Sequence, residues 1–201
     1  DGGGAKVMCD EGLMERFAIA QVFALHNGPN MEAGAFFTAP GPIMAAVDTF
    51  RVQITGKGGH GAYPHETADP VIAAASLAQA LQTIVSRNNR SLDDLVLSVT
   101  QIQTGTAENI IPQTAFVGGT VRTFDPAVQD MVEQRMAEIV AGQAASFAVG
   151  ATLEYERGYP ATVNHVDQVE LAAAAARDVS GAAAVDANMS REMGAEDFAY
   201  M

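Results

Sequence analysis

The sequence has little basic charge and no long apolar run. Its 201 residues include 11 Lys and Arg against 24 Asp and Glu, which gives a formal net charge of −13. Nucleic acids and acidic lipid surfaces are bound through basic residues, so we expect neither as a partner. No apolar stretch approaches the roughly 18 to 20 residues that cross a bilayer, and the first residues lack the features of a secretion signal. The sequence therefore predicts no membrane association.

Cysteine is also scarce, because Cys9 is the only one in the sequence. A single cysteine cannot form an intramolecular disulfide, and this favours a reducing, cytoplasmic location. The 48% of hydrophobic residues indicates a folded chain with a core. The sequence starts at Asp1 without a methionine and stops at Met201 directly after an acidic and aromatic stretch. We therefore expect a piece of a longer protein.

The middle of the chain carries the clearest pattern. Phe50, Val52 and Ile54 alternate with polar residues, which predicts a strand with one exposed face. Asp69-Pro70 and Asp125-Pro126 each combine an N-cap with a first-turn proline, and an apolar stripe follows both pairs, so each predicts the start of a helix. Further strands are predicted over residues 95–102, 115–124 and 151–155.

Between residues 46 and 163 this order is β-α-β-β-α-β, the pattern of ferredoxin-like α+β domains. The flanking pieces, residues 1–45 and 164–201, are each too short to fold alone. We therefore expect them to form one incomplete α/β domain that is interrupted by a complete inserted domain at 46–163.

One candidate metal ligand follows a predicted buried strand. Ile19 to Leu25 is an apolar run broken only by Gln21, and His26 comes directly after it. Ligand sites in open α/β sheets lie at the carboxyl ends of strands, where a neutral imidazole can bind a divalent metal. A histidine that bonds only to its own loop is the alternative.

Three further candidates lie in the middle domain. His60 stands between glycines in Gly59-His60-Gly61, where small neighbours and positive φ angles would bring the imidazole close to a substrate; a flexible loop with a solvated histidine is the alternative. Asn109 could offer a donor and an acceptor to an amide, or form a turn. Arg122, on a predicted strand, could bind a carboxylate in bidentate fashion, or lie on the exposed face.

Nine segments in order resemble the M20 metallopeptidase family, and within it the amidohydrolase branch of hippurate hydrolase, N-acyl-amino-acid amidohydrolases and indole-acetyl-amino-acid hydrolases. They are GGGAKVM (2–8), ALHNGP (24–29), PGPIMAAVDTF (40–50), GKGGHGAYPH (56–65), ADPV (68–71), LQTIVSRN (81–88), NIIP (109–112), GGTVRTF (118–124) and MGAEDFAYM (193–201).

The resemblance implies an α/β catalytic domain with two divalent metal ions, zinc or manganese with cobalt or nickel as alternatives. It also implies a ferredoxin-like satellite domain that forms a homodimer, with a tetramer as the larger alternative. His26 matches a metal ligand, and His60 matches the histidine that stabilises the oxyanion in the partner's active site. Asn109 and Arg122 match residues that position the substrate amide and bind its carboxylate. Gly194, with Ala195, matches a loop near that carboxylate.

The family's remaining metal ligands and its glutamate pair have no counterpart in these 201 residues, so His26 is the one matching metal ligand. The expected activity of the intact protein is metal-dependent hydrolysis of the amide bond in N-acyl or aryl-acyl amino acids. An exopeptidase or dipeptidase of the same family is the alternative. Taken at face value, the 201 residues would be an inactive fragment that still dimerises.

Overall fold

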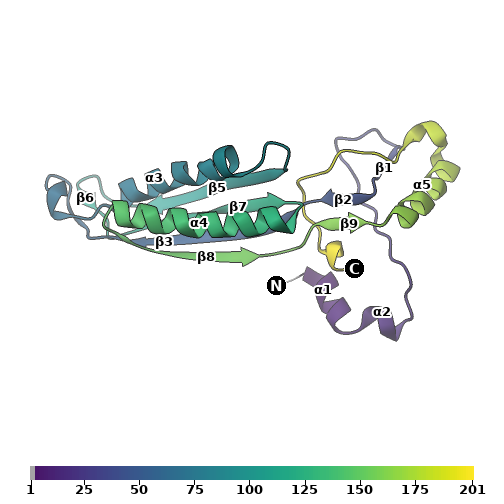
Figure 1. Ribbon diagram of the computed structural model, residues 1–201, viewed down its shortest axis with the longest axis horizontal. Helices are drawn as coiled ribbons and strands as arrows, with labels where there is room; N and C mark the ends of the chain where they lie inside the picture. Colours follow the sequence, from purple (N-terminus) through teal and green to yellow (C-terminus); the bar gives the residue numbers. More distant parts are fainter. Residues whose placement is uncertain (1–2) are drawn as a thin grey trace. The chain divides into compact units, whose positions relative to one another are not determined.

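The computed structural model describes residues 3–201, which form two compact units. The first unit contains residues up to Ala46 and Tyr159–Met201, and the second is Val47–Gly158. Together they form a mixed α/β structure (Figure 1). Asp1, where the first catalytic piece was expected to begin, and Gly2, the first residue of the GGGAKVM segment, lie outside the described residues.

The second unit is built on a four-stranded sheet in the order β5-β7-β3-β8. Its strands are β3 (Ala46–Thr55), β5 (Leu95–Thr104), β7 (Thr114–Thr123) and β8 (Gly150–Arg157). The short strands β4 (Gly59–His60) and β6 (Ile110–Ile111) form a separate ladder. The helices are α3 (Pro70–Thr83), which continues as a π-helical turn over Ile84–Asn88, and α4 (Pro126–Ser146); a 3-10 turn spans Pro64–Glu66.

Both long helices begin where the Asp-Pro pairs predict. The Asp69 side chain accepts hydrogen bonds from the backbone N–H groups of Val71 and Ile72, and the Asp125 side chain accepts one from Ala127. These carboxylates satisfy donors that an α-helix leaves without partners at its first turn. The helices pack against one another and against the sheet, α3 on β5 and β7 and α4 mainly on β8.

The core of this unit lies between the helices and the sheet (Figure 1). The side chains of Phe50, Val52 and Ile54 are all at most 2% exposed and contact buried residues of both helices. Their neighbours Arg51 and Gln53 are exposed, as the alternating pattern of β3 predicts. The helices therefore cover one face of the sheet, and the exposed polar side chains of β3 occupy the other.

The first unit contains shorter elements. It has helices α1 (Gly3–Asp10), α2 (Leu13–Arg16) and α5 (Val166–Ser180), and 3-10 turns at Ala182–Ala184 and Asp197–Tyr200. A parallel pair joins β1 (Phe36–Phe37) to β10 (Val185–Asp186), and an antiparallel pair joins β2 (Gly41–Met44) to β9 (Thr162–Asn164).

The predicted strand from Ile19 to Leu25 is wrong. This segment has no regular secondary structure, and Leu25 is 81% exposed instead of buried. A strand needs a neighbour for its backbone N–H and C=O groups. Within the described residues no other segment pairs with this one, so its apolar side chains have no sheet in which to be buried.

None of the helices in the described part of the chain combines the length and the apolar character that crossing a membrane requires.

Candidate functional site

In the first unit, His26 lies against a carboxylate from the far end of the sequence. Its Nε2 atom is 2.5 Å from Oε2 of Glu196, which stands 170 positions later. An ionised carboxylate only accepts hydrogen bonds, so Nε2 is the donor, and the neutral form of the ring would carry its lone pair on Nδ1. Histidines that bind metals are commonly oriented by a carboxylate in this way. The His26 side chain is 64% exposed, so the pair lies at the surface of its unit.

Glu196 is held by a second contact as well. Its Oε1 accepts a hydrogen bond of 3.3 Å from the backbone N–H of Phe198, at the start of the last 3-10 turn. The hydrogen bond with His26 is the main reason that the pKa of Glu196 lies below its ordinary value, and the Phe198 contact adds to it. The carboxylate is therefore ionised at neutral pH and is a fixed negative partner for the imidazole.

The same unit places Gly194 close to strand β2. Its backbone carbonyl accepts a 2.8 Å hydrogen bond from Ala45, and a Cβ at this position would lie 3.2 Å from the Met44 side chain. Gly194 is exposed and is two residues from Glu196. The GAEDFAY segment thus brings a predicted substrate-loop residue and the partner of the predicted metal ligand into one short stretch.

In the second unit, His60 belongs to the short strand β4, and β4 pairs with β6 through His60 and Ile110. The next residue, Gly61, donates a 2.8 Å backbone hydrogen bond to the carbonyl of Asn109. The structure therefore brings His60 and Asn109 together, although they are 49 positions apart in the sequence.

The imidazole of His60 has a defined orientation. Its Nδ1 accepts a 3.1 Å hydrogen bond from the backbone N–H of Ala62, and its ring centroid lies 5.6 Å from that of Tyr63. Because Nδ1 is an acceptor, the neutral ring carries its proton on Nε2. His60 is exposed. It therefore presents one N–H donor to an approaching group.

The glycines around His60 were predicted to adopt positive φ angles, but the structure uses them for close packing of the backbone. None of Gly56, Gly58, Gly59 and Gly61 has a positive φ angle. A Cβ on Gly56 would lie 2.1 Å from the carbonyl oxygen of Ala68, and one on Gly58 would lie 2.7 Å from that of Ile111. The glycines allow backbone segments to pack closely, and backbone hydrogen bonds from Gly56 and Lys57 hold the loop at 2.8 and 2.9 Å. The loop is thus a packed structure and not a loose one.

Arg122 lies on β7, between Val121 and Thr123, which are buried under the helices. By alternation its side chain belongs to the opposite face of the sheet, where it is half-buried. Within residues 3–201, the guanidinium takes part in no side-chain hydrogen bond or ion pair. It is free to bind an anionic group.

The structure does not bring Arg122 to His60 and Asn109. The loop that carries His60 is hydrogen-bonded through Gly56 to Gln113, which directly precedes the first residue of β7. Arg122 is the second-last residue of β7, at the opposite end of the strand. Eight residues of strand from Thr114 to Arg122 correspond to about 26 Å at about 3.3 Å per residue. Within one chain, the three predicted residues of the second unit therefore form two groups at opposite ends of β7.

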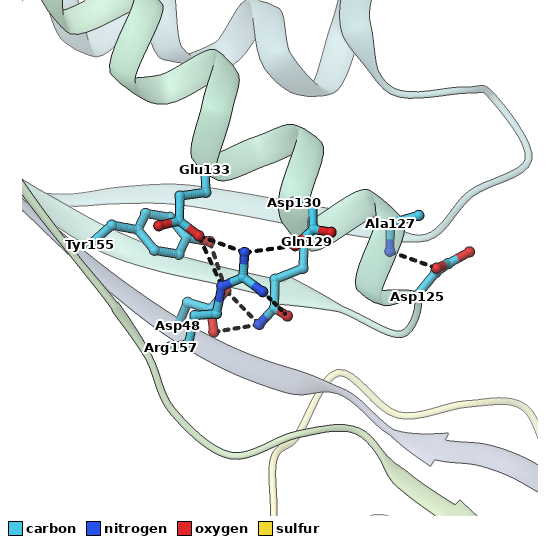
Figure 2. Close-up of polar contacts among 8 residues, drawn as sticks. All are labelled: Asp48, Asp125, Ala127, Gln129, Asp130, Glu133, Tyr155 and Arg157. Atoms are coloured by element: carbon cyan, nitrogen blue, oxygen red, sulfur yellow. Dashed lines mark hydrogen bonds and ion pairs between the residues drawn. The ribbon is translucent and has the colours of Figure 1, made fainter.

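The second unit also contains a buried polar cluster that no sequence motif indicates (Figure 2). Asp48 is only 1% exposed. Its carboxylate accepts hydrogen bonds of 2.9 and 3.0 Å from the Gln129 side chain and one of 2.7 Å from the Tyr155 hydroxyl. Arg157 donates to Gln129 and forms ion pairs with Asp130 and Glu133, at 2.7 and 2.6 Å.

These contacts join β3, β8 and the first turns of α4, and we refer to them as the Asp48 cluster. Burial and the hydrogen bond to Asp48 raise the pKa of Tyr155 far above its ordinary value, so the phenol remains a donor. Both carboxylate oxygens of Asp48 have partners. The cluster is therefore a satisfied structural element with no side chain directed at a ligand.

Comparisons with known proteins show the family of this chain. A family model described as a peptidase dimerisation domain matches residues 46–147, which is half of the chain. The chain belongs to the M20 family. N-acetyl-L-cysteine deacetylase of Bacillus subtilis is 38% identical over 200 residues, which cover 99% of this chain and 47% of the relative. Hippurate hydrolase of Campylobacter jejuni is 33% identical over 198 residues, which cover 98% and 52%.

Solved structures show the same relationship. A Staphylococcus aureus protein superposes with a TM-score of 0.85 at 28% identity, over 99% of this M20 chain and 50% of the other. A Bacillus subtilis protein described as a dinuclear metal-binding peptidase of the M20 family superposes with a TM-score of 0.76, also at 28% identity, over 98% and 48%. The chain thus spans about half the length of the curated relatives and solved structures cited here.

The metal-ligand chemistry of the M20 chain can be tested against its own residues. Zinc sites normally use three or four protein ligands. Among residues 3–201, no group of three or more His, Cys, Asp and Glu side chains is placed to hold a metal ion. His26 offers one nitrogen and Glu196 orients it, so these residues fit one part of a metal site and do not complete one.

Proposed function

We propose that an M20 subunit containing these residues hydrolyses the amide bond of N-acyl or aryl-acyl amino acids and depends on divalent metal ions. The family and the names of the relatives support this proposal, since those relatives are named for N-acetylcysteine, N-acetyldiaminopimelate and hippurate. Each of these names denotes an amino acid with an acyl group on its nitrogen. The observation in this chain that carries the proposal is the orientation of His60.

Amide hydrolysis develops negative charge on the carbonyl oxygen, and a fixed donor stabilises that charge. The Ala62 N–H occupies Nδ1 of His60, which leaves the Nε2 proton for the oxyanion. We place this donor in the active site of the partner subunit, as the family resemblance implies. Asn109, whose backbone carbonyl accepts a hydrogen bond from Gly61 beside His60, would position the substrate amide.

Arg122 would bind the free carboxylate of the amino acid, because a guanidinium on a rigid strand can make a bidentate contact. Gly194 would lie close to this carboxylate. His26, oriented by Glu196, would provide one ligand to the metal site. The rest of that site requires ligands beyond the ones described here, and we assign no step of the reaction to the metal.

This function also assigns roles to the two units. We propose that Val47–Gly158 is the ferredoxin-like satellite domain and that the other unit is part of the α/β catalytic domain into which it is inserted. The strand order β5-β7-β3-β8 with two helices on one face supports the first assignment. A homodimer formed through the satellite domain is consistent with the matching family model. We expect a cytoplasmic location.

Peptide hydrolysis is the second candidate. Two Saccharolobus solfataricus relatives named thermostable carboxypeptidases are 39% identical over 166 residues, 81% of this chain. A carboxypeptidase substrate shares the free carboxylate and the scissile amide, so Arg122 and His60 would have the same roles. The two activities are distinguished by assaying a blocked dipeptide beside N-acetyl amino acids and hippurate. Faster hydrolysis of the blocked dipeptide would favour the carboxypeptidase, and faster hydrolysis of the N-acyl amino acids would favour the amidohydrolase.

The test compares hydrolysis with and without a chelator, and compares His60→Ala with His65→Ala. His65 lies in the same segment, and its side chain is 73% exposed. Loss of one oxyanion donor typically lowers kcat about 100- to 1000-fold, so we expect that decrease for His60→Ala with unchanged metal content. We expect no change for His65→Ala.

Turnover that is insensitive to chelation would refute metal dependence, and loss of metal in His60→Ala would refute the oxyanion role. The 201 residues assayed alone address the remaining alternative. We expect a stable, inactive dimer, and turnover by this piece would show that it is sufficient for catalysis.

A further inference from the structure

The segment that contains His26 carries the one Asn-Gly pair of the sequence, Asn27-Gly28. Asparagine is thermolabile, because the backbone nitrogen of the next residue can attack its side-chain amide. A glycine permits this attack best, since it has no side chain that shields its nitrogen and its backbone rotates most freely. Each of the other asparagines precedes a larger residue. The sequence therefore distinguishes Asn27 from the other asparagines by its chemistry.

The structure leaves both residues of this pair free to react. Asn27 and Gly28 are exposed, and they lie in a stretch without regular secondary structure, residues 19–28. Within residues 3–201, neither the side-chain amide of Asn27 nor the backbone N–H of Gly28 takes part in a hydrogen bond. The two atoms that must join, Cγ of Asn27 and the nitrogen of Gly28, are therefore not held in other contacts.

Other asparagines of the chain provide comparisons. Nδ2 of Asn164 donates a 3.0 Å hydrogen bond to the carbonyl of Ala39, so that amide is held in place. Asn30 lies in the same segment as Asn27 and is also exposed, but it precedes a methionine. Asn109 is exposed and precedes an isoleucine, whose branched side chain is stiff and bulky. Exposure alone is thus shared by several asparagines, and the free glycine nitrogen belongs to Asn27.

We propose that Asn27 is a site of spontaneous deamidation, with water as the co-reactant. The nitrogen of Gly28 bonds to Cγ of Asn27, and the Cγ–Nδ2 bond breaks. The side-chain NH2 leaves as ammonia with the proton of the Gly28 N–H, which closes a succinimide ring. Water opens this ring at Cγ to give aspartate, or at the main-chain carbonyl to give isoaspartate. Both products carry one more negative charge than asparagine.

The change occurs directly beside the contact between His26 and Glu196. Nε2 of His26 lies 2.5 Å from Oε2 of Glu196. Isoaspartate at position 27 adds one main-chain atom between His26 and Gly28, because the chain then runs through Cβ and Cγ. Glu196 is held separately by the backbone N–H of Phe198, at 3.3 Å, and does not move with this segment. Isoaspartate therefore displaces the imidazole from its carboxylate partner.

The effect on activity rests on the proposed function, in which His26 is a metal ligand. A displaced imidazole holds a metal ion less well, because ligand atoms must keep a defined geometry. The whole subunit should therefore lose metal and activity as isoaspartate accumulates at position 27. Deamidation of Asn27 is in this way a slow, spontaneous inactivation.

The modification is tested by incubating the 201-residue chain and the whole subunit at mildly alkaline pH, followed by peptide mapping with mass spectrometry. We expect release of ammonia and conversion of Asn27 before Asn30 and Asn109. The added negative charge, on a chain of formal net charge −13, should appear as an acidic shift in isoelectric focusing. An unchanged Asn27, or conversion of all three asparagines at the same rate, would overturn the proposal.

A matched pair of variants assigns the shift to one residue. Asn27→Gln keeps a side-chain amide but lengthens it, so attack by the Gly28 nitrogen would have to close a larger ring, and the acidic shift should disappear. Asn30→Gln makes the same change three positions later and should shift as the unchanged chain does. A shift that persists in Asn27→Gln would place the reactive amide elsewhere and refute the assignment.

The link to His26 is tested on the whole subunit, by measuring metal content and hydrolysis during incubation. Both should decline with the isoaspartate fraction, and Asn27→Gln should keep both at its own starting values. Asn27→Asp adds the charge without the additional main-chain atom and should keep its metal. An equal decline in Asn27→Gln, or loss of metal in Asn27→Asp, would refute this link. If the fresh subunit hydrolyses no acylated amino acid, the proposed function fails, while mass spectrometry still decides the modification.

Discussion

The half of Val47–Gly158 formed by α3 and β5 and the half formed by α4 and β8 share one core but have different surfaces. Buried side chains from both helices contact the same inward face of the sheet. On the α4 side, the Asp48 cluster joins β3, β8 and α4 (Figure 2). On the α3 side, neither α3 nor β5 contains a charged residue, and Ile72 and Ile102 are exposed. The comparison separates a half that is joined by buried and surface polar contacts from a half whose helix and edge strand carry no charge.

The largest effect should come from the shared core and should be similar in both halves. Leu81 on α3 and Met136 on α4 are both fully buried. Replacement of either by alanine removes packed atoms and leaves a cavity, so each change should lower the free energy of unfolding by about 2 to 5 kcal/mol. Hydrogen exchange of the β3 amides in the 201-residue chain measures this loss.

The exposed neighbours Gln82→Ala and Gln134→Ala are the matched controls, with expected changes within about 0.5 kcal/mol. If Leu81→Ala weakened only the amides of β5 and β7, the two halves would be separate cooperative units.

An intermediate effect is expected in the charged half alone. Tyr155→Phe removes one of the donors to the buried Asp48 carboxylate. Oδ2 of Asp48 then accepts a hydrogen bond from Gln129 alone. A hydrogen bond to a charged group contributes about 1.5 to 3 kcal/mol, and we expect a loss near the lower end of that range in the same hydrogen-exchange measurement, because Gln129 still donates to this oxygen. Glu154→Gln, at an exposed position on the same strand, should have little effect.

The pH dependence of this variant supplies an independent check. The pKa of Tyr155 is raised in the folded state, so its contribution is fully present below about pH 10, the ordinary pKa of tyrosine, and is lost as the pH rises above it. The stability advantage of the unchanged chain over Tyr155→Phe should therefore shrink above that pH. An advantage that grows with pH would contradict the assignment.

The smallest effect should come from the exposed ion pairs. Arg157→Gln removes the contacts with Asp130 and Glu133, but the arginine side chain is 44% exposed. Exposed pairs contribute about 0 to 1 kcal/mol and are screened by salt, so we expect a small loss that decreases in 1 M salt. Arg51→Gln, whose single pair with Glu156 is 3.7 Å long, should be closer to neutral. A loss as large as that of Tyr155→Phe would mean that Arg157 is essential to the cluster.

Local sequence signals predicted the elements of the second unit well. Asp69 and Asp125 cap their helices because a side-chain carboxylate and the next two residues are enough to begin a helix. The alternation around Phe50 placed the core face of β3 correctly, because strand periodicity is local. The resemblance of nine short segments identified the M20 family, which the comparisons confirm.

The errors occurred where a residue's environment depends on distant segments. The Ile19 to Leu25 run resembles a buried strand, but a strand exists only when another segment pairs with it. The glycines beside His60 were assigned to positive φ angles, whereas the structure uses them for close approach to the backbone at Ala68 and Ile111. The contact between Glu196 and His26 gave no signal in the sequence, because no local pattern links two residues that are 170 positions apart.

The sequence by itself determined the family, the order of the long strands and helices between Ala46 and Arg157, and the residue types that could bind a carboxylate or stabilise an oxyanion. These depend on composition, on periodicity and on short motifs. Only the tertiary structure decided that Glu196 orients His26, that His60 and Asn109 lie together, and that Arg122 lies at the other end of β7. It also placed the charged and uncharged elements at opposite edges of one sheet. Such pairings are set by strand order and packing, which bring together residues far apart in the chain.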